Sequence, residues 1–166
     1  NPDIDPKTNR CIDTGQADSK FGISYEEILD NVELIKSLSN INIIGIHIHI
    51  GSQIRELHVF ENMCNKVNVI VDNLTKLGFE IEFVDVGGGL GINYDVPENE
   101  PIPNFASLFS IVREYLNVEG KEVHFEFGRS IVGECGELIT SVLYNKTTAT
   151  GRRLLIIDAS MTELIR

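Results

Sequence analysis

The spacing of apolar residues predicts alternating helices and strands from residue 25 to residue 127. In some segments apolar positions recur every three or four residues, whereas β-branched runs bounded by turn residues fill the others. This alternation favours an α/β fold with a parallel sheet and crossover helices. In chain order, the pattern predicts a helix at 25–38, a strand at 41–50, a helix at 57–77, a strand at 81–86, a helix at 105–116 and a strand at 121–127.

Local sequence signals mark where some of these elements begin and end. Ser24 and Glu27 have the spacing of a capping box and predict the start of the first helix. Gly78 predicts the end of the second helix, because glycine favours the left-handed conformation that closes many helices. Residues 1–20 are polar and rich in turn-forming residues, which predicts a loop.

The pattern changes after the last of these strands. Residues 137–147 and 152–160 form two strand-like runs joined by the short connection TATG, with no helix between them. Such a pair predicts antiparallel strands in a second, all-β module. We therefore expect a boundary near 130–136, with one domain at 1–132 and the start of another at 133–166.

Charge and cysteine content narrow the expected partners. The 166 residues include 14 basic and 25 acidic side chains, for a formal net charge of −11. Nucleic acid and anionic membranes are poor partners for such a chain, although glycine amides and an arginine can still form a local anion site. Three widely spaced cysteines, Cys11, Cys64 and Cys135, are typical of the reducing cytoplasm. Because the chain starts at Asn1 and stops within MTELIR, we expect a piece of a longer polypeptide.

Unusual residues follow each of the three predicted parallel strands. The strands run into HIHIGSQI, VDVGGGLG and FEFGRS, and parallel strands bring their C-terminal ends to one rim, where α/β folds bind ligands. Gly87, Gly88 and Gly89 can present backbone amides to an anion. A run of three glycines alone is more often a tight or flexible turn, and it lacks the register of the dinucleotide-binding fingerprint.

The histidine pair and the Glu–Arg pair each allow several interpretations. His47 and His49 lie two residues apart and therefore share one face of their strand. The pair suits packing and hydrogen bonding inside the protein, or stacking on an aromatic ligand. Zinc binding fits least well, since no further residue has metal-ligand spacing. Glu126 and Arg129 form either a surface ion pair or a ligand site. Together with phosphate donors such as Ser52, these residues suit a flat, protonated, phosphorylated heterocycle, such as pyridoxal 5′-phosphate.

Six segments, in order, resemble the alanine-racemase-like, fold type III pyridoxal-phosphate decarboxylases. The resemblance covers nearly the whole chain and implies the last three strands of a (β/α)₈ barrel, followed by the first strands of a C-terminal β domain. It also implies a cytoplasmic homodimer with a shared active site. The segments are NPDIDPKTN, SKFGI, GIHIHIGSQI, VDVGGGLGINYD, FEFGRSIVGECG and DASMTELIR.

The resemblance implies roles for individual residues. It places the imidazole of His49 on the cofactor ring and pairs Glu126 with the pyridine nitrogen. It places Arg129 near the phosphate and the substrate carboxylate, and it has Arg166 bind a carboxylate at the far end of the substrate. The full cofactor-binding set that it implies is His49, Ser52, Gly87, Gly88, Gly89, Glu126, Phe127, Gly128 and Arg129.

The chain departs from the family pattern in two places and lacks one catalytic group. Phe127 stands where the family usually has proline, which predicts a looser turn, and Ser160 stands where glycine is common. The family's Schiff-base lysine lies on an early barrel strand, so we expect it upstream and expect this segment alone to be inactive. Lys20 belongs to a different family motif and does not take that role.

Several functions remain open at the level of sequence. An amino-acid decarboxylase whose substrate ends in a carboxylate fits Arg166 best, because arginine suits a carboxylate. A sister decarboxylase acting on arginine, ornithine or carboxynorspermidine is the second enzyme hypothesis. Three further hypotheses are a non-catalytic homologue, a phosphate-binding barrel without pyridoxal and a metal hydrolase using His47 and His49. In every case the remaining segments of the same polypeptide are expected partners, since three barrel strands leave unpaired edges.

Overall fold

The computed structural model describes residues 1–99 and 102–163, and the chain divides into two compact units. The first unit is Asn1–Gly133 and the second is Glu134–Arg166. All of the strand ends singled out from the sequence belong to the first unit.

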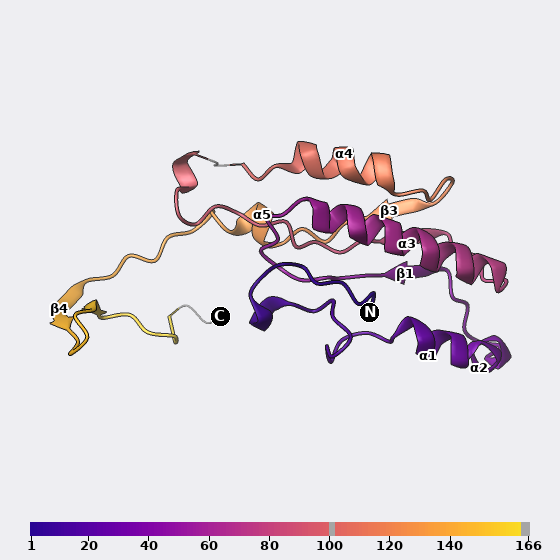
Figure 1. The fold of residues 1–166 in the computed structure, drawn as a ribbon, viewed down its shortest axis with the longest axis horizontal. Helices are drawn as coiled ribbons and strands as arrows, with labels where there is room; N and C mark the ends of the chain where they lie inside the picture. The colour runs from indigo at the N-terminus through magenta and orange to yellow at the C-terminus, as the bar shows by residue number, and fades with distance from the viewer. Residues whose placement is uncertain (100–101, 164–166) are drawn as a thin grey trace. The chain divides into compact units, whose positions relative to one another are not determined.

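The first unit contains a three-stranded parallel sheet, which confirms the α/β prediction (Figure 1). Its strands are β1 (Gly45–His47), β2 (Phe83–Asp85) and β3 (Glu122–His124), in the spatial order β1-β2-β3. Val84 of β2 pairs with Ile46 on one side and Val123 on the other. The strands are shorter than predicted at 41–50, 81–86 and 121–127. The N-terminal part of the first run, including Ile41 at 57% exposure, stays outside the sheet.

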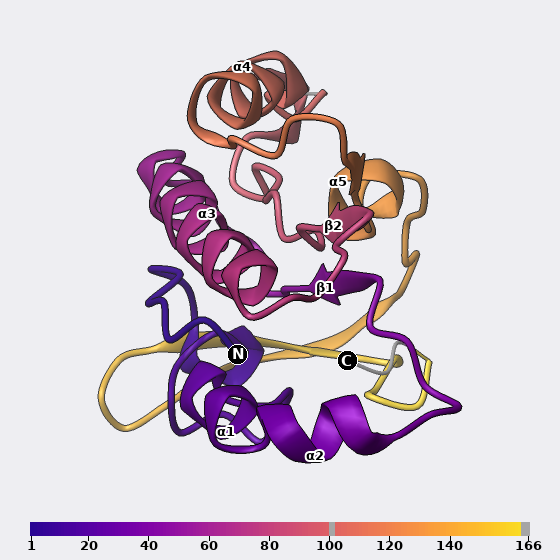
Figure 2. The same cartoon turned by 90° about the vertical axis from the view of Figure 1, so that its right-hand side faces the viewer.

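Two crossover helices connect these strands. Helix α3 (His58–Lys76) lies between β1 and β2 in the chain, and α4 (Phe105–Tyr115) lies between β2 and β3. Both agree with the predicted helices, and the two run side by side (Figures 1 and 2). Gly78 has φ +88°, and the Phe79 amide donates to the Leu74 carbonyl at 3.1 Å, which closes α3 as predicted.

The predicted helix at 25–38 is interrupted. Helix α1 (Tyr25–Asp30) and helix α2 (Val32–Ser37) are separated by Asn31, whose φ of −111° and ψ of 11° are not helical. The side-chain amide of Asn31 donates to the Glu27 carbonyl at 2.8 Å. It takes the place of the backbone N–H that would bond this carbonyl in a continuous helix. The capping box is confirmed, because the Ser24 hydroxyl accepts from the Glu27 amide and the Glu27 carboxylate accepts from the Ser24 amide.

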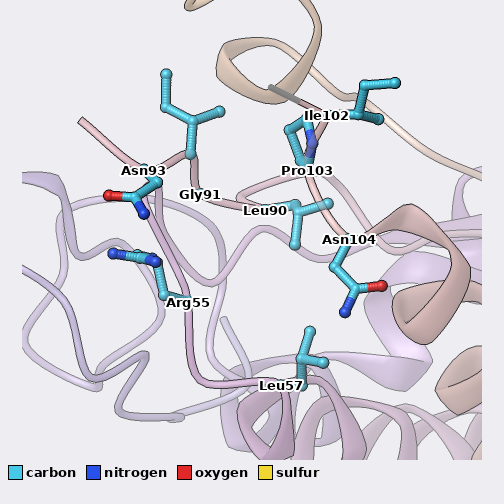
Figure 3. Close-up of a pocket in the computed structure, with 9 residues that line it drawn as sticks. Arg55, Leu57, Leu90, Gly91, Asn93, Ile102, Pro103 and Asn104 are labelled. Carbon is cyan, nitrogen blue, oxygen red and sulfur yellow. The ribbon is translucent and has the colours of Figure 1, made fainter. Parts of the chain in front are cut away.

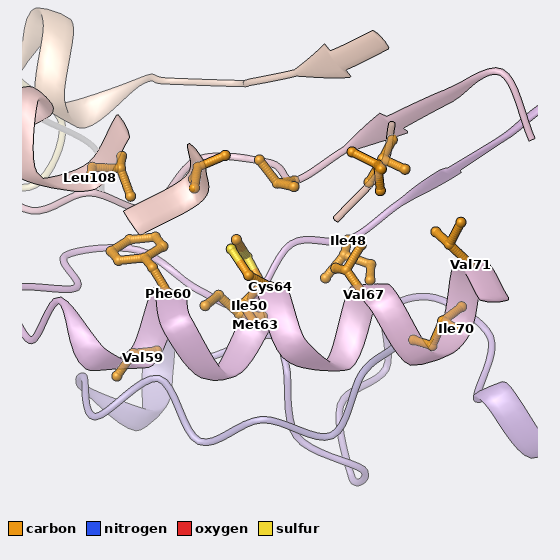
Figure 4. Close-up of a cluster of buried hydrophobic side chains, with 14 of the residues drawn as sticks. Ile48, Ile50, Val59, Phe60, Met63, Cys64, Val67, Ile70, Val71 and Leu108 are labelled. Atoms are coloured by element: carbon orange, nitrogen blue, oxygen red, sulfur yellow. The ribbon is translucent and has the colours of Figure 1, made fainter. Parts of the chain in front are cut away.

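The core of the first unit lies between α3 and the sheet. Val84, at the centre of β2, is fully buried, as expected for the middle strand of a sheet covered by helices. The buried face of α3 points at the segment after β1 that carries Ile48 and Ile50, with Leu108 of α4 beside Phe60 (Figure 4). The buried side chains of α3 are Val59, Phe60, Met63, Cys64, Val67, Ile70, Val71 and Leu74.

Residues 1–20 form the predicted loop, but the loop is attached to the segment after β1. It contains one short 3₁₀ helix, η1 (Arg10–Ile12). The Thr14 hydroxyl donates to the His49 carbonyl at 2.9 Å, and the Thr8 hydroxyl donates to the Ser52 carbonyl at 2.8 Å. The loop therefore fixes the backbone that carries two of the predicted site residues. Two further short helices, η2 (Pro97–Asn99) and α5 (Arg129–Val132), complete this unit.

The second unit contains an antiparallel pair, β4 (Val142–Thr147) and β5 (Arg153–Ile157). The pairing agrees with the predicted hairpin, although both strands are shorter than 137–147 and 152–160. Every residue of β4 is exposed, and Ile139 before it is 90% exposed. In the described part of the chain, no helix has the length and apolar character needed to cross a membrane.

Candidate functional site

Backbone hydrogen bonds extend beyond the short strands and hold their C-terminal ends together. The Ile48 amide donates to the Asp85 carbonyl at 2.9 Å, and the Val86 amide donates to the His124 carbonyl at 3.0 Å. The Glu126 amide donates to the Gly87 carbonyl at 2.8 Å. The ends of the three strands therefore meet at one rim, as parallel pairing predicts.

All three glycines after β2 are required by close packing, and a Cβ on Gly89 would lie 2.4 Å from the carbonyl oxygen of Gly51. A Cβ on Gly88 would lie 2.2 Å from the carbonyl oxygen of Glu126, and a Cβ on Gly87 would lie 2.6 Å from the carbonyl oxygen of Ile48. Gly87 also has φ +67°, in the left-handed region that glycine favours. The absence of side chains thus lets the turn sit directly between the segments that carry His49 and Glu126.

The amides of this turn have partners within the protein. The Gly87 amide donates to Asp85 Oδ1 at 2.8 Å, and the Gly88 amide donates to His49 Nδ1 at a long 3.4 Å. The turn therefore orients the imidazole of His49 through its backbone. The close packing agrees with the tight turn that the sequence allowed, whereas anion binding by these amides stays a prediction.

The two histidines share one face, as predicted, and meet the carboxylate of Glu126. His47 Nε2 lies 3.2 Å from Glu126 Oε2, and the side chains are 52% and 56% exposed. One ligand atom each from His47, His49 and Glu126 lie within 4.8 Å of one another. The meeting of His49 and Glu126 agrees with the predicted rim, whereas the contact of His47 with Glu126 was not predicted from the sequence.

The environment of His49 favours its neutral form. Burial lowers the pKa of the His49 imidazole below its ordinary value of 6.5, and the neighbouring His47 lowers it further, against smaller opposing effects of Glu126 and Asp85. A neutral imidazole suits stacking on an aromatic ring.

The lowered pKa of His49 predicts a pH dependence of stability. The unfolded chain binds a proton at His49 below about pH 6.5, whereas the folded chain binds it only at lower pH, so the free energy of unfolding should rise with pH up to about 6.5. Urea unfolding of the full-length protein at several pH values measures this slope. In His49→Gln the slope should decrease, and an unchanged slope would contradict the assignment.

Arg129 lies between two hydroxyl groups. Its Nε donates to Ser52 Oγ at 3.2 Å, and its Nη1 donates to Tyr94 Oη at 2.7 Å. The guanidinium carbon lies 5.7 Å from the centre of the Tyr94 ring. Arg129 and Ser52, predicted separately, are therefore in contact. Tyr94 was not predicted, although it stands in the same VDVGGGLGINYD segment as the glycines.

Phe127 and Gly128 do not bring side chains into this group. Phe127 packs edge-on against Phe105, with ring centres 5.1 Å apart, and stacks with Phe125 at 5.2 Å. Along an extended backbone its side chain is directed opposite to that of Glu126. Gly128 is the N-cap residue of α5 and has open space around it. Arg166 lies outside the described residues.

Two further polar residues belong to this region and were not predicted. Gln53 has φ +60°, and its side chain both donates to the Ile92 carbonyl at 2.7 Å and accepts from the Ile92 amide at 3.1 Å. This double hydrogen bond ties the loop after β1 to the loop after β2. The buried hydroxyl of Ser130 has no hydrogen-bond partner among the described residues, so it is a polar atom that a ligand or another part of the protein would satisfy.

Two cavities flank these loops. One of about 450 Å³ is lined by His47, Ile48 and His49 together with residues of the N-terminal loop, so there is room beside the imidazoles. A smaller cavity of about 150 Å³ contains none of the predicted site residues. Figure 3 shows Arg55, Asn93 and Asn104 around that second cavity.

Comparison with known proteins identifies the family. Residues 1–133 match the family described as pyridoxal-dependent decarboxylase, pyridoxal binding domain. The chain therefore belongs to the pyridoxal-dependent decarboxylases, which confirms the resemblance indicated by its motifs.

The similar proteins carry a more specific name. The chain is 41% identical over 167 residues to the diaminopimelate decarboxylase of Bacteroides thetaiotaomicron, covering 100% of this chain and 43% of that protein. It is 40% identical over 166 residues to that of Aquifex aeolicus, covering 100% and 39%. The crystal structure of diaminopimelate decarboxylase from Helicobacter pylori complexed with L-lysine superimposes with a TM-score of 0.81 at 37% identity, covering 97% of this chain and 39% of that one. The chain thus spans 39% to 43% of the length of these curated relatives.

Proposed function

We propose that this chain is a segment of a meso-diaminopimelate decarboxylase that uses pyridoxal 5′-phosphate and forms L-lysine and CO₂. The observation that carries the proposal is the meeting of His49 and Glu126 across a glycine turn that has no space for side chains. The names of the similar proteins support the substrate, and the family supports the cofactor.

The donor set fits this cofactor. The carboxylate of Glu126 lies beside the imidazole of His49, and Ser52 and Arg129 form a hydroxyl–guanidinium pair suited to a phosphate group. The close approach of Gly88 to the Glu126 backbone leaves no space for a side chain between Glu126 and the turn. These features match an aromatic, phosphorylated, protonated ligand better than a simple sugar phosphate.

Each residue has a defined task in the proposed mechanism. When bound, pyridoxal phosphate supplies an electron sink for the electrons released as CO₂ leaves the substrate. Glu126 holds a proton at the ring nitrogen, which preserves that capacity. The imidazole of His49 would lie against the ring and orient it. Ser52 and Arg129 would bind the phosphate and so anchor the ring, and the Arg129 guanidinium would also attract a substrate carboxylate.

Substrate choice is assigned to a residue outside the described part of the chain. Arg166 binds the distal carboxylate of diaminopimelate in this proposal. A decarboxylase for arginine, ornithine or carboxynorspermidine is the alternative, and a cationic end of the substrate suits an arginine poorly.

The wider assembly also belongs to the proposal. Residues 1–132 form the last three strands of a (β/α)₈ barrel, and residues 133–166 begin a C-terminal β domain. The exposed strands of the second unit, with Leu155 at 64% and Tyr144 at 63% exposure, support packing against the rest of the polypeptide. The protein acts in the cytoplasm as a homodimer with a shared active site.

Turnover by the full-length protein tests this function. Meso-diaminopimelate should be decarboxylated to lysine, while ornithine, arginine and carboxynorspermidine should react much more slowly. Consumption of a cationic substrate in preference to diaminopimelate would overturn the substrate assignment. Binding of the cofactor without turnover of any of them would favour the non-catalytic homologue.

Tyr94→Phe tests the position of Arg129. Phenylalanine keeps the aromatic ring under the guanidinium and removes only the hydroxyl that accepts from Nη1. Loss of one hydrogen bond of about 1 kcal/mol should raise the dissociation constant of the cofactor by roughly fivefold. Titration of the full-length apoenzyme with pyridoxal phosphate, followed by absorbance, measures the change. An affinity equal to that of the wild type would mean that the Tyr94 hydroxyl does not position Arg129.

A further inference from the structure

We propose that, in the cofactor-free protein, His47, His49 and Glu126 bind a divalent transition-metal ion such as Zn²⁺, and that the metal and the cofactor exclude each other. Metal binding stands on this geometry alone, whereas the exclusion rests on the proposed function, in which His49 and Glu126 hold the cofactor. The metal site is independent of substrate choice.

The distances suit a common metal ion. Two ligands of a tetrahedral Zn²⁺, each about 2.0–2.1 Å from the metal, lie about 3.3 Å apart. His47 Nε2 and Glu126 Oε2 already lie 3.2 Å apart. The third ligand atom, from His49, lies within 4.8 Å of both, so a side-chain shift of roughly 1.5 Å completes the set.

The ligand types and exposure also suit this ion. Two imidazoles and one carboxylate form the ligand composition of open zinc sites, and imidazole favours zinc and its neighbours over calcium or magnesium. His47 and Glu126 are about half exposed, and the 450 Å³ cavity beside the histidines leaves room for water as a fourth ligand. The carboxylate of Asp85 acts on His49 electrostatically and adds negative charge to the surroundings.

The mutual exclusion follows from shared groups. A Glu126 oxygen bound to a metal is unavailable to the pyridine nitrogen of the cofactor. A metal-bound His49 directs the edge of its ring to the metal, so its face is not available for stacking on the cofactor. Replacement of His47 distinguishes the metal-bound state from the cofactor-bound state, because His47 is a metal ligand in this proposal and has no assigned contact with the cofactor.

The test uses the full-length protein stripped of cofactor and titrated with ZnCl₂ by calorimetry. We expect one Zn²⁺ per chain, and added pyridoxal phosphate should release it. His47→Gln should lower the affinity for Zn²⁺ by at least about tenfold and lower cofactor affinity by a smaller factor. Absence of stoichiometric binding, or equal Zn²⁺ affinity in wild type and His47→Gln, would overturn the proposal. Zn²⁺ and pyridoxal phosphate bound together would overturn the exclusion.

A matched control is present on the same sheet. His124 Nε2 lies 3.0 Å from Glu122 Oε2, and among the described residues no third metal-binding side chain joins this pair. His124→Gln should therefore leave the Zn²⁺ affinity unchanged, and a loss equal to that of His47→Gln would contradict the site. Metal binding is measured without cofactor, so failure of the wild type to bind pyridoxal phosphate would count against the proposed function and not against the metal site.

Discussion

Replacing Glu126 with glutamine should lower kcat/KM for decarboxylation by about 100-fold or more in the full-length enzyme. Glutamine has nearly the same shape but carries no negative charge, so it cannot favour a proton on the pyridine nitrogen. The side chain is about half exposed and its neighbour His47 is accessible to water, so the fold should remain stable. Steady-state kinetics and the absorbance of the bound cofactor measure the two effects separately.

Glu122→Gln is the matched control for this prediction. Glu122 belongs to β3, as close to its own histidine as Glu126 is to His47, and it is exposed. Its replacement should change kcat/KM by less than about threefold, because it lies outside the proposed site. Similar activities of Glu126→Gln and wild type would show that Glu126 does not act on the reacting ring.

Gly88→Ala should damage both folding and activity. Its Cβ would lie 2.2 Å from the Glu126 carbonyl oxygen and 2.9 Å from the carbonyl carbon, and both atoms belong to backbone that cannot rotate away. Such overpacking costs about 1–3 kcal/mol of stability. The displaced backbone carries Glu126, and a displacement of about 1 Å lowers activity by about 100-fold. Thermal unfolding and turnover of the full-length protein measure both losses.

Gly136→Ala provides the comparison, because a Cβ at Gly136 meets nothing within 4 Å and its backbone is not left-handed. That variant should unfold and react as the wild type does. A Gly88→Ala protein with wild-type stability and activity would mean that the turn after β2 is not packed against Glu126 as described.

The sequence predicted the elements better than their contacts. Periodicity located α3 and α4, and the alternation of side chains placed His47 and His49 on one face. The break at Asn31 was missed, because a non-helical residue inside an amphipathic run does not alter the apolar spacing.

The contacts at the site required information that spacing does not contain. The contact between His47 and Glu126 joins β1 to the segment after β3, two strands that are not adjacent in the sheet, and it depends on the register of both with β2. Tyr94 belongs to the GINYD segment, and its contact with Arg129 forms only when the chain is folded. No local pattern distinguishes such a tyrosine from an ordinary surface residue.

Phe127 gives the turn that carries Glu126 and Arg129 a different kind of restraint from the family's proline. A proline ring restricts the backbone in the unfolded chain as well as in the folded one. Phe127 restricts it through its contacts with Phe125 and with Phe105 and Phe109, and the last two contacts exist only after α4 has packed. In this protein the shape of the turn is therefore a product of folding, acquired together with the aromatic cluster, and a loosening of α4 would reach Glu126 and Arg129 through Phe125 and Phe127.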